Sequence, residues 1–122
     1  MFTIPLGLFH VLCSDVIHIF MEYVPGGSLE ALIRRFGKFP EDLAAVYTSQ
    51  ILSGLAYLHD KEIMHRDIKC ANILVTTEGV VKLADFGASK ELSPRFGGGD
   101  ATVTGTPLFM APEVVLGKTY GM

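Results

Sequence analysis

The sequence predicts an α+β fold in which short strands surround two consecutive helices. Apolar runs rich in β-branched side chains, such as Ile63–Met64 and Ile73–Val75, are too short for helices and are typical of strands. Val80 and Val81 form a third run of this kind. Between residues 28 and 60, by contrast, the apolar side chains have the spacing of amphipathic helices. The polar residues between the short runs are then expected to lie in loops.

The first part of the chain is expected to form two strands, over residues 8–12 and 17–24. The Pro-Gly-Gly sequence at residues 25–27 breaks regular structure and forces a turn after the second strand. Residues 1–16 are apolar, but no Lys or Arg precedes their apolar run, so a signal peptide is not expected. Polar residues interrupt the same segment, which argues against a membrane span.

Two helices should follow the turn. Ser28 is suited to the N-cap of a short helix over Leu29–Phe36, and Gly37 is suited to ending it. A longer helix should begin near Pro40 and Glu41, because proline is tolerated in a first turn and a carboxylate favours the helix dipole there. One face of the longer helix is expected to pack in the core, and it carries Leu43, Val46, Tyr47, Gln50, Ile51, Gly54, Leu55 and Leu58.

Composition excludes some classes of function. The chain has 122 residues, a formal net charge of −3 and no basic stripe, so nucleic acid is not an expected partner. Its two cysteines and four histidines are too few and too scattered for a disulfide framework or a zinc site. Reduced thiols and a cytoplasmic location are therefore expected.

Two polar stretches carry side chains with distinct chemistry. Asp67 can accept a proton from an attacking hydroxyl, and Lys69 can place a positive charge beside a migrating phosphoryl group. Asn72 and Asp85 are hard oxygen donors of the kind that Mg²⁺ prefers. Each of these residues taken alone is more often an ordinary surface residue than a functional one, so the interpretation depends on the joint pattern.

The joint pattern resembles the eukaryotic Ser/Thr protein kinases. The string H-R-D-I-K-C-A-N at residues 65–72 is followed in order by D-F-G at 85–87 and A-P-E at 111–113. The resemblance extends over residues 17–122. Within the family, residues 20–29 and 65–74 resemble the mitogen-activated protein kinase kinase kinases and their sterile-group relatives.

The resemblance implies a partial protein-kinase-like fold. Residues 1–24 would be the last small-lobe strands and the hinge, and residues 25–122 would be the helical first half of the large lobe. Residues 85–113 would be the activation segment. The implied activity is phosphoryl transfer from ATP, with Mg²⁺, to a Ser or Thr of a protein substrate, for example a downstream kinase.

The same resemblance implies roles for individual residues. Asp67 corresponds to the catalytic base, Lys69 to the cation on the transferred phosphate, and Asn72 and Asp85 to the Mg²⁺ ligands. The spacing of Lys69 after Asp67 is typical of Ser/Thr kinases. The implied ATP-binding residues are the hinge and its neighbours, Met21 as gatekeeper, Glu22, Tyr23 and Val24, with Leu74 under the adenine ring.

Further positions are implied to be structural or regulatory. His65 and Phe86 would hold the loop in its active arrangement by packing, and Arg66 would bind a phosphate of the activation loop. Gly87, Thr106 and Glu113 are the other positions of this kind. Thr106 would bridge Asp67 and Lys69. Thr102 is the first candidate phosphorylation site, followed by Thr104 and Ser93, although each can equally be a solvated loop hydroxyl.

Other parts of the family pattern do not occur in these 122 residues. No Gly-rich phosphate loop and no Val-Ala-Ile-Lys-like lysine precede the hinge. One expectation is therefore a kinase segment with little or no turnover on its own, and with apolar faces left uncovered. The alternative is a non-catalytic, kinase-derived module that binds nucleotide or another protein.

Overall fold

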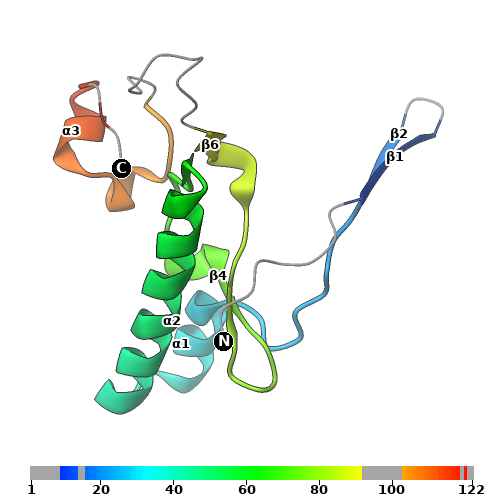
Figure 1. The fold of residues 1–122 in the computed structure, drawn as a ribbon. Helices are drawn as coiled ribbons and strands as arrows, with labels where there is room; N and C mark the ends of the chain where they lie inside the picture. Colours follow the sequence, from blue (N-terminus) through cyan, green and yellow to red (C-terminus); the bar gives the residue numbers. More distant parts are fainter. Residues whose placement is uncertain (1–8, 14–15, 92–102, 119, 121–122) are drawn as a thin grey trace.

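The computed structural model describes residues 9–13, 16–91, 103–118 and 120. Its helices and short antiparallel strands confirm the predicted α+β composition (Figure 1). Strands β1 (Phe9–Cys13) and β2 (Val16–Phe20) form a hairpin that extends away from the helical part of the molecule. The prediction that the second strand continues to Val24 is wrong, because residues 21–24 belong to no strand of the described chain. This segment is held through side-chain contacts instead.

The first helix, α1 (Leu29–Phe36), has the ends that the sequence predicts. The Ser28 hydroxyl accepts a hydrogen bond from the Ala31 backbone nitrogen at 3.2 Å. Gly37 ends the helix with φ of 80°, and its nitrogen donates to the Ile33 carbonyl oxygen at 2.9 Å. A residue with a Cβ adopts this backbone conformation only at a cost, so glycine is favoured at this position.

The second helix, α2 (Glu41–Asp60), is the longest element and contacts strands β3 (Ile63–Met64) and β5 (Val81–Leu83). Its buried residues are Gly54 and Leu58, both in the C-terminal half of the helix. The predicted apolar stripe is only partly correct, because Leu43 is 36% exposed and Val46 is 53% exposed. The strands pack against the later turns of α2, and its first turns therefore keep more of their apolar surface open.

A small hairpin of β4 (Ile73–Val75) and β5 (Val81–Leu83) forms the centre of the core. The pair next to the turn of this hairpin is Val75 with Val81. The strand predicted to begin at Val80 therefore begins one residue later than expected. The core cluster combines the hairpin with one residue from α1 and one from α2, and its members are Leu29, Leu58, Ile73, Val75, Val81 and Leu83. The loops before β4 and after β5 are therefore attached directly to the core.

Two further contacts tie this hairpin to its surroundings. The Gln50 side chain donates to the Gly79 carbonyl oxygen at 3.2 Å and accepts from the Val81 nitrogen at 2.9 Å, which fixes the β4–β5 turn on α2. On the other side, the Val75 nitrogen donates to the Gly27 carbonyl oxygen at 2.9 Å. A Cβ on Gly26 would lie 2.0 Å from the Val75 carbonyl oxygen, so only glycine permits this crossing.

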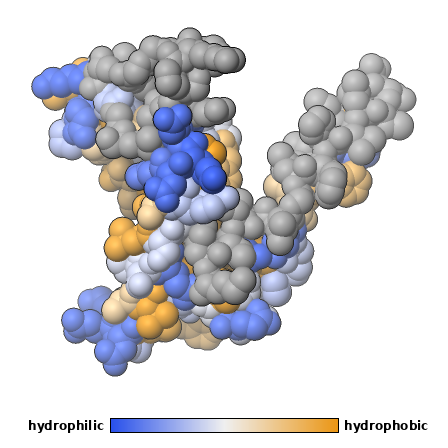
Figure 2. Space-filling model, in the orientation of Figure 1, coloured by the Kyte–Doolittle hydropathy of each residue, from blue (hydrophilic) through white to orange (hydrophobic). Residues whose placement is uncertain are grey.

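The remaining elements are short. Strand β3 (Ile63–Met64) pairs with β6 (Lys90–Glu91), and single turns form η1 (Cys70–Asn72), η2 (Phe86–Ala88), η4 (Pro107–Phe109) and α3 (Pro112–Val115). Figure 2 shows hydrophobic residues interspersed with hydrophilic ones over the visible face of the helical part. None of the helices in the described ranges is long and apolar enough to cross a membrane.

Candidate active site

The loop between β3 and η1 carries the first group of predicted site residues. Arg66 lies in this loop with φ of 66°, a left-handed conformation that costs a residue with a side chain on the order of 1 kcal/mol. Its side-chain Nε donates to the Ala88 carbonyl oxygen at 2.5 Å, which links the loop to the end of η2. The strained turn is therefore held by its neighbours, and it directs the next side chain, Asp67, into the site.

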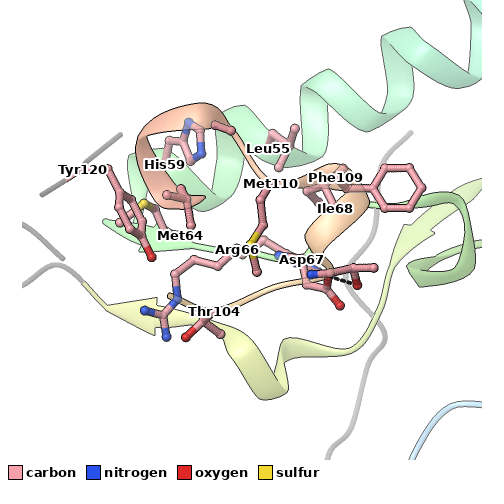
Figure 3. Close-up of a pocket in the computed structure, with 14 residues that line it drawn as sticks. Leu55, His59, Met64, Arg66, Asp67, Ile68, Thr104, Phe109, Met110 and Tyr120 are labelled. Carbon is pink, nitrogen blue, oxygen red and sulfur yellow. Dashed lines mark hydrogen bonds between the residues drawn. The ribbon is translucent and has the colours of Figure 1, made fainter. Parts of the chain in front are cut away.

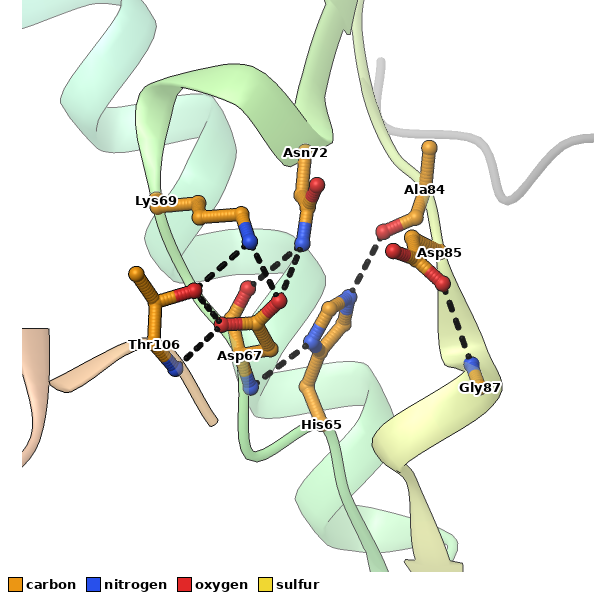
Figure 4. Close-up of polar contacts among 8 residues, drawn as sticks. All are labelled: His65, Asp67, Lys69, Asn72, Ala84, Asp85, Gly87 and Thr106. Atoms are coloured by element: carbon orange, nitrogen blue, oxygen red, sulfur yellow. Dashed lines mark hydrogen bonds and ion pairs between the residues drawn. The ribbon is translucent and has the colours of Figure 1, made fainter. Parts of the chain in front are cut away.

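The Asp67 carboxylate accepts hydrogen bonds from three other residues (Figure 4). Its Oδ2 accepts from Lys69 Nζ at 2.7 Å and from Asn72 Nδ2 at 2.9 Å. Its Oδ1 accepts from the backbone nitrogen of Thr106 at 3.0 Å and from the Thr106 hydroxyl at 2.7 Å. Led by the bond from Lys69, these donors stabilise the ionised form and lower the Asp67 pKa to about 2.

Thr106 joins the loop that carries Asp67 to the later part of the chain. Its hydroxyl donates to Asp67 and accepts from Lys69 Nζ at 2.7 Å, which is the bridge that the sequence resemblance implies. The preceding residue, Gly105, has φ of 123°, and a Cβ there would lie 2.7 Å from the Arg66 carbonyl oxygen. The close approach of these two segments therefore requires glycine at position 105.

The orientation of the Asn72 amide follows from its hydrogen bonds. Asn72 is buried, and its Nδ2 donates to both the backbone oxygen of Asp67, at 2.9 Å, and the Asp67 carboxylate. Because an amide nitrogen only donates and an amide oxygen only accepts, these contacts identify the nitrogen. The Asn72 Oδ1 atom is then the one that remains to contact a ligand.

Asp85 is brought beside Asn72 through the backbone of the residue before it. The Ala84 nitrogen donates to the Asn72 carbonyl oxygen at 2.8 Å. His65 is buried, and its Nε2 lies 3.0 Å from the Ala84 carbonyl oxygen. Its Nδ1 accepts from the Asp67 nitrogen at 3.4 Å, so the proton belongs on Nε2 and is donated to Ala84. The ring of His65 thus connects the loops that carry the two carboxylates (Figure 4).

Asp85 itself is exposed and has a left-handed backbone with φ of 62°. Its carboxylate accepts one bond, at 3.3 Å, from the nitrogen of Gly87, and the adjacent Phe86 ring packs against His65 with 4.9 Å between ring centroids. The turn is therefore held by ring packing and by the backbone, while the carboxylate keeps lone pairs for a ligand.

The two oxygen donors of the site, Asn72 and Asp85, suit a magnesium ion, which needs few ligands from the protein. In the described part of the chain no three His, Cys, Asp or Glu side chains are grouped as a metal site. The neighbouring Asn72 and Asp85 offer an amide oxygen and a carboxylate, both hard donors. Mg²⁺ commonly takes only one or two protein oxygens and completes its shell with water and phosphate oxygens.

The predicted ATP-binding residues fall into two groups. Met21 and Tyr23 are 72% and 83% exposed, whereas Val24 is buried. The Glu22 carboxylate pairs with Lys82 Nζ on β5. Leu74 is half-buried, and it forms an isolated β-bridge with Ser28. Gly27 and Ser28, just after the segment 21–24, are thus attached to β4, and Glu22 within the segment is attached to β5.

The regulatory candidates are only partly described. Ser93 and Thr102 lie outside the described residues. Thr104 is half-buried and lines the same cavity as Arg66, and Figure 3 draws it beside the guanidinium. Glu113 is exposed in the first turn of α3.

The cavity has a volume of about 310 Å³ and lies between the end of α2, the loop that carries Asp67 and the segment 104–114 (Figure 3). Its lining is mainly apolar and includes Leu55, Met64, Met110 and Val114. Arg66 and Asp67 lie at the same cavity, so the apolar space adjoins the site directly.

Sequence reasoning did not predict the contacts of three residues that hold the site in place. Gln50 fixes the β4–β5 turn, Gly26 permits the crossing over β4, and Lys82 pairs with Glu22. Only Lys82 carried a usable signal, because a lysine between Val81 and Leu83 in a short apolar strand needs a partner when that strand is buried.

The sequence matches a known family of proteins. The model of the protein kinase domain family matches residues 7–122. Mitogen-activated protein kinase kinase kinase 3 of Arabidopsis thaliana is 54% identical over 104 residues, which are 84% of this chain and 16% of that protein. Mitogen-activated protein kinase kinase kinase 3 of Mus musculus is 51% identical over 110 residues, which are 88% and 18%. Cytokinesis protein sepH of Emericella nidulans is 51% identical over 102 residues, which are 84% and 7%.

The chain thus spans less than a fifth of the length of these relatives. The family match nevertheless covers nearly all of it, and it includes the loop with Asp67 and the turn with Asp85. The chain therefore belongs to the protein kinase family and is similar to its mitogen-activated protein kinase kinase kinase branch.

Proposed function

We propose that the site binds ATP with Mg²⁺ and serves the transfer of the terminal phosphoryl group to a Ser or Thr hydroxyl of a protein. The main support is the hydrogen-bonded group of Asp67, Lys69 and Thr106, with Asn72 and Asp85 beside it. Phosphoryl transfer needs positioning and charge more than covalent chemistry, and this group supplies both.

Asp67 is proposed to orient the attacking hydroxyl and then to accept its proton. With a pKa of about 2 the carboxylate is fully ionised at neutral pH but is a weak base. Its oxygens already accept four hydrogen bonds, so a substrate hydroxyl must replace one of these donors. The proton passes to the carboxylate as the new oxygen–phosphorus bond forms and the hydroxyl becomes acidic. The bond from phosphorus to the leaving oxygen of ADP breaks in the same step.

Lys69 and the two oxygen donors are proposed to act on the phosphates. The ammonium group of Lys69 lies next to Asp67 and brings positive charge to the place where the hydroxyl would attack. Asn72 Oδ1 and the Asp85 carboxylate would hold Mg²⁺, which neutralises phosphate charge when it is bound. The bond from Asn72 Nδ2 to Asp67 keeps the amide oxygen turned away from the base, toward this ligand role.

The adenine is proposed to lie against the segment 21–24, with Leu74 under the ring. Val24 is buried, and Leu74 bridges Ser28, so the end of this segment is close to the strand that carries Leu74. In this proposal residues 1–24 are the last strands of a small lobe with its hinge. Residues 25–122 are then the first half of a large lobe, with the activation segment at 85–113.

The proposed substrate is a serine or threonine on a downstream kinase. Two relatives are named mitogen-activated protein kinase kinase kinases, and each shares at least half of its aligned residues with this chain. Phosphorylation of the chain itself is proposed at Thr104, because it lines the same cavity as Arg66. A guanidinium can hold a phosphate by two parallel hydrogen bonds.

Titration of the 122-residue chain with a fluorescent ATP analogue, with and without Mg²⁺, tests the proposal. Binding should tighten with Mg²⁺, and Asp85→Ala should remove that dependence. Asp67→Asn should leave the affinity within about threefold, because Asp67 faces the substrate hydroxyl. The matched control is Glu78→Gln, which neutralises an exposed carboxylate on the β4–β5 turn. Binding that ignores both Mg²⁺ and Asp85→Ala would contradict the proposal.

Turnover by the same chain is expected to be slight, because the residues present include no Gly-rich loop and no lysine before the hinge. Transfer of labelled phosphate from ATP to a Ser/Thr substrate protein measures it. Clear Mg²⁺-dependent transfer that Asp85→Ala abolishes would overturn this expectation while supporting the assignment of the site.

A further inference from the structure

Lys82 is a buried lysine that the proposed reaction does not use. It lies in the middle of β5, where Val81 and Leu83 are core residues, and it is 7% exposed. Its ammonium group pairs with the carboxylate of Glu22, sixty residues earlier in the chain. Glu22 lies in the segment 21–24, which belongs to no described strand.

The pair is a specific connection between two segments and differs from an ordinary surface contact. The side chain of Lys82 is 9% exposed, so a bare ammonium there would be strongly destabilised unless a carboxylate compensated it. The Glu22 side chain is 30% exposed and therefore approaches from the rim of the core. Because the ammonium is short of water, the position of Glu22 is restricted to where its carboxylate reaches Lys82.

Strand β5 also leads directly to the site. Lys82 precedes Asp85 by three residues, and the intervening Ala84 is fixed by its bonds with Asn72 and His65. Val81 is fixed at the other end of the strand by Gln50. A contact to Lys82 is therefore a contact to a strand whose position is set at both ends.

We propose that Lys82 and Glu22 form a positioning pair that sets the segment 21–24 relative to β5, and so relative to Asp85. The inference rests on the proposed function in one respect, namely that the segment 21–24 takes the adenine of ATP. Neither side chain needs to touch the nucleotide. The pair acts through the backbone of the segment, whose amide and carbonyl groups would contact the base.

Backbone order in the nucleotide-free chain tests the positioning itself. In Lys82→Met, ¹⁵N relaxation order parameters of residues 22–24 should fall from about 0.85 to below about 0.6, while those of α2 stay unchanged. The exchanged pair Glu22→Lys/Lys82→Glu should restore the order. Asp60→Asn is the matched control, since it neutralises an exposed carboxylate at the C-terminal end of α2. Unchanged order at 22–24, or an equal loss of order throughout the chain, would overturn the proposal.

Base selectivity tests the consequence for recognition. ITP carries the triphosphate of ATP but lacks its 6-amino group, so the ratio of the two affinities reports contacts to the base alone. Lys82→Met should reduce the preference for ATP by roughly fivefold, the effect of about one hydrogen bond, and leave the affinity for ITP unchanged. The exchanged pair should restore the preference. Equal losses for both nucleotides, or no change in preference, would show a general structural role and contradict the inference.

The two measurements separate this inference from the proposed function. If the unsubstituted chain binds neither nucleotide, the proposed function fails, whereas the order parameters still decide whether the pair positions the segment. If the chain binds ATP with Mg²⁺ but Lys82→Met changes neither order nor selectivity, the proposed function stands and the positioning pair is refuted.

Discussion

The two aspartates of the site lie on neighbouring loops and are held in opposite ways. Four hydrogen bonds from Lys69, Asn72 and Thr106 occupy the oxygens of Asp67. Asp85 is exposed and accepts one long bond from Gly87. The protein has thus satisfied the first carboxylate from its own donors and left the second one largely open. This difference is what a reaction needs when one acid orients a substrate and the other binds a cation.

The difference originates in what surrounds each loop. Asp67 receives donors from its own loop, from η1 and from the segment before η4, so distant parts of the sequence must meet there. Asp85 is positioned mainly through the backbone of Ala84 and the ring of Phe86. The first loop should therefore be sensitive to changes that separate segments, and the second should be sensitive to ligands.

The largest expected effect comes from two matched glycine substitutions. Gly105→Ala places a Cβ 2.7 Å from the Arg66 carbonyl oxygen at a positive φ, and should destabilise the chain by about 3 kcal/mol. Gly87→Ala places a Cβ 3.2 Å from a side-chain oxygen of Asp85, and should cost less than about 1 kcal/mol. Urea unfolding measures both. Equal costs would contradict the contrast between the loops.

Removing the carboxylates should reveal the same contrast. Asp67→Ala removes the carboxylate that accepts from Lys69, Asn72 and Thr106, and should lower the free energy of unfolding by about 2 kcal/mol. Asp85→Ala should change it by less than about 0.5 kcal/mol, because an exposed residue loses only a weak bond. Chemical denaturation with the m-value monitored compares them. A larger cost at Asp85 would mean that its loop is held by contacts other than those described.

Thr106 separates the role of the hydroxyl from that of the backbone. Thr106→Val keeps the shape and the backbone bond to Asp67 but removes the hydroxyl, and should cost about 1 kcal/mol. It should also raise the pKa of Asp67, because one of the bonds that lower it is lost. Thr106→Ser is the control and should retain both properties. Thermal unfolding and a carboxyl NMR titration measure the two effects, and an unchanged pKa in Thr106→Val would contradict the assignment of the bridge.

A pH dependence of stability is also expected from Asp67. The Asp67 pKa is lowered in the folded chain from 3.8 to about 2, so the unfolded chain binds the proton more readily. This contribution is fully present above about pH 4 and is lost as the pH falls toward 2. Lys69→Met should flatten that part of the profile, because Lys69 is the main cause of the shift. A profile from urea titrations at several pH values that is identical for both chains would refute the assignment.

Local signals in the sequence predicted much of the fold. The ends of α1 followed from a serine and a glycine, and the strands β3 and β4 followed from their β-branched runs. The second strand was drawn too long, and the first turns of α2 were expected to be more buried than they are. Both errors concern which partner an apolar residue meets, and periodicity does not contain that information.

The candidate site divides in the same way. Asp67, Lys69 and Asn72 lie within one short string, so the motif alone predicted that they act together. Lys82 contacts Glu22, which is 60 positions away in the sequence, and Gln50 contacts Val81, which is 31 positions away. Such contacts depend on how the chain packs, and a single sequence shows only that a lysine in an apolar strand requires a partner.

The central claim is that Asn72 and Asp85 share one cation that carries the nucleotide. Mn²⁺ substituted for Mg²⁺, with an ATP analogue bound to the ¹⁵N-labelled chain, broadens the NMR signals of groups near the metal. We expect the strongest broadening at the Asn72 side-chain amide and at the backbone amides of Asp85 and Gly87. This broadening should be lost in Asp85→Ala. Strongest broadening elsewhere in the chain, or broadening that survives Asp85→Ala unchanged, would contradict it.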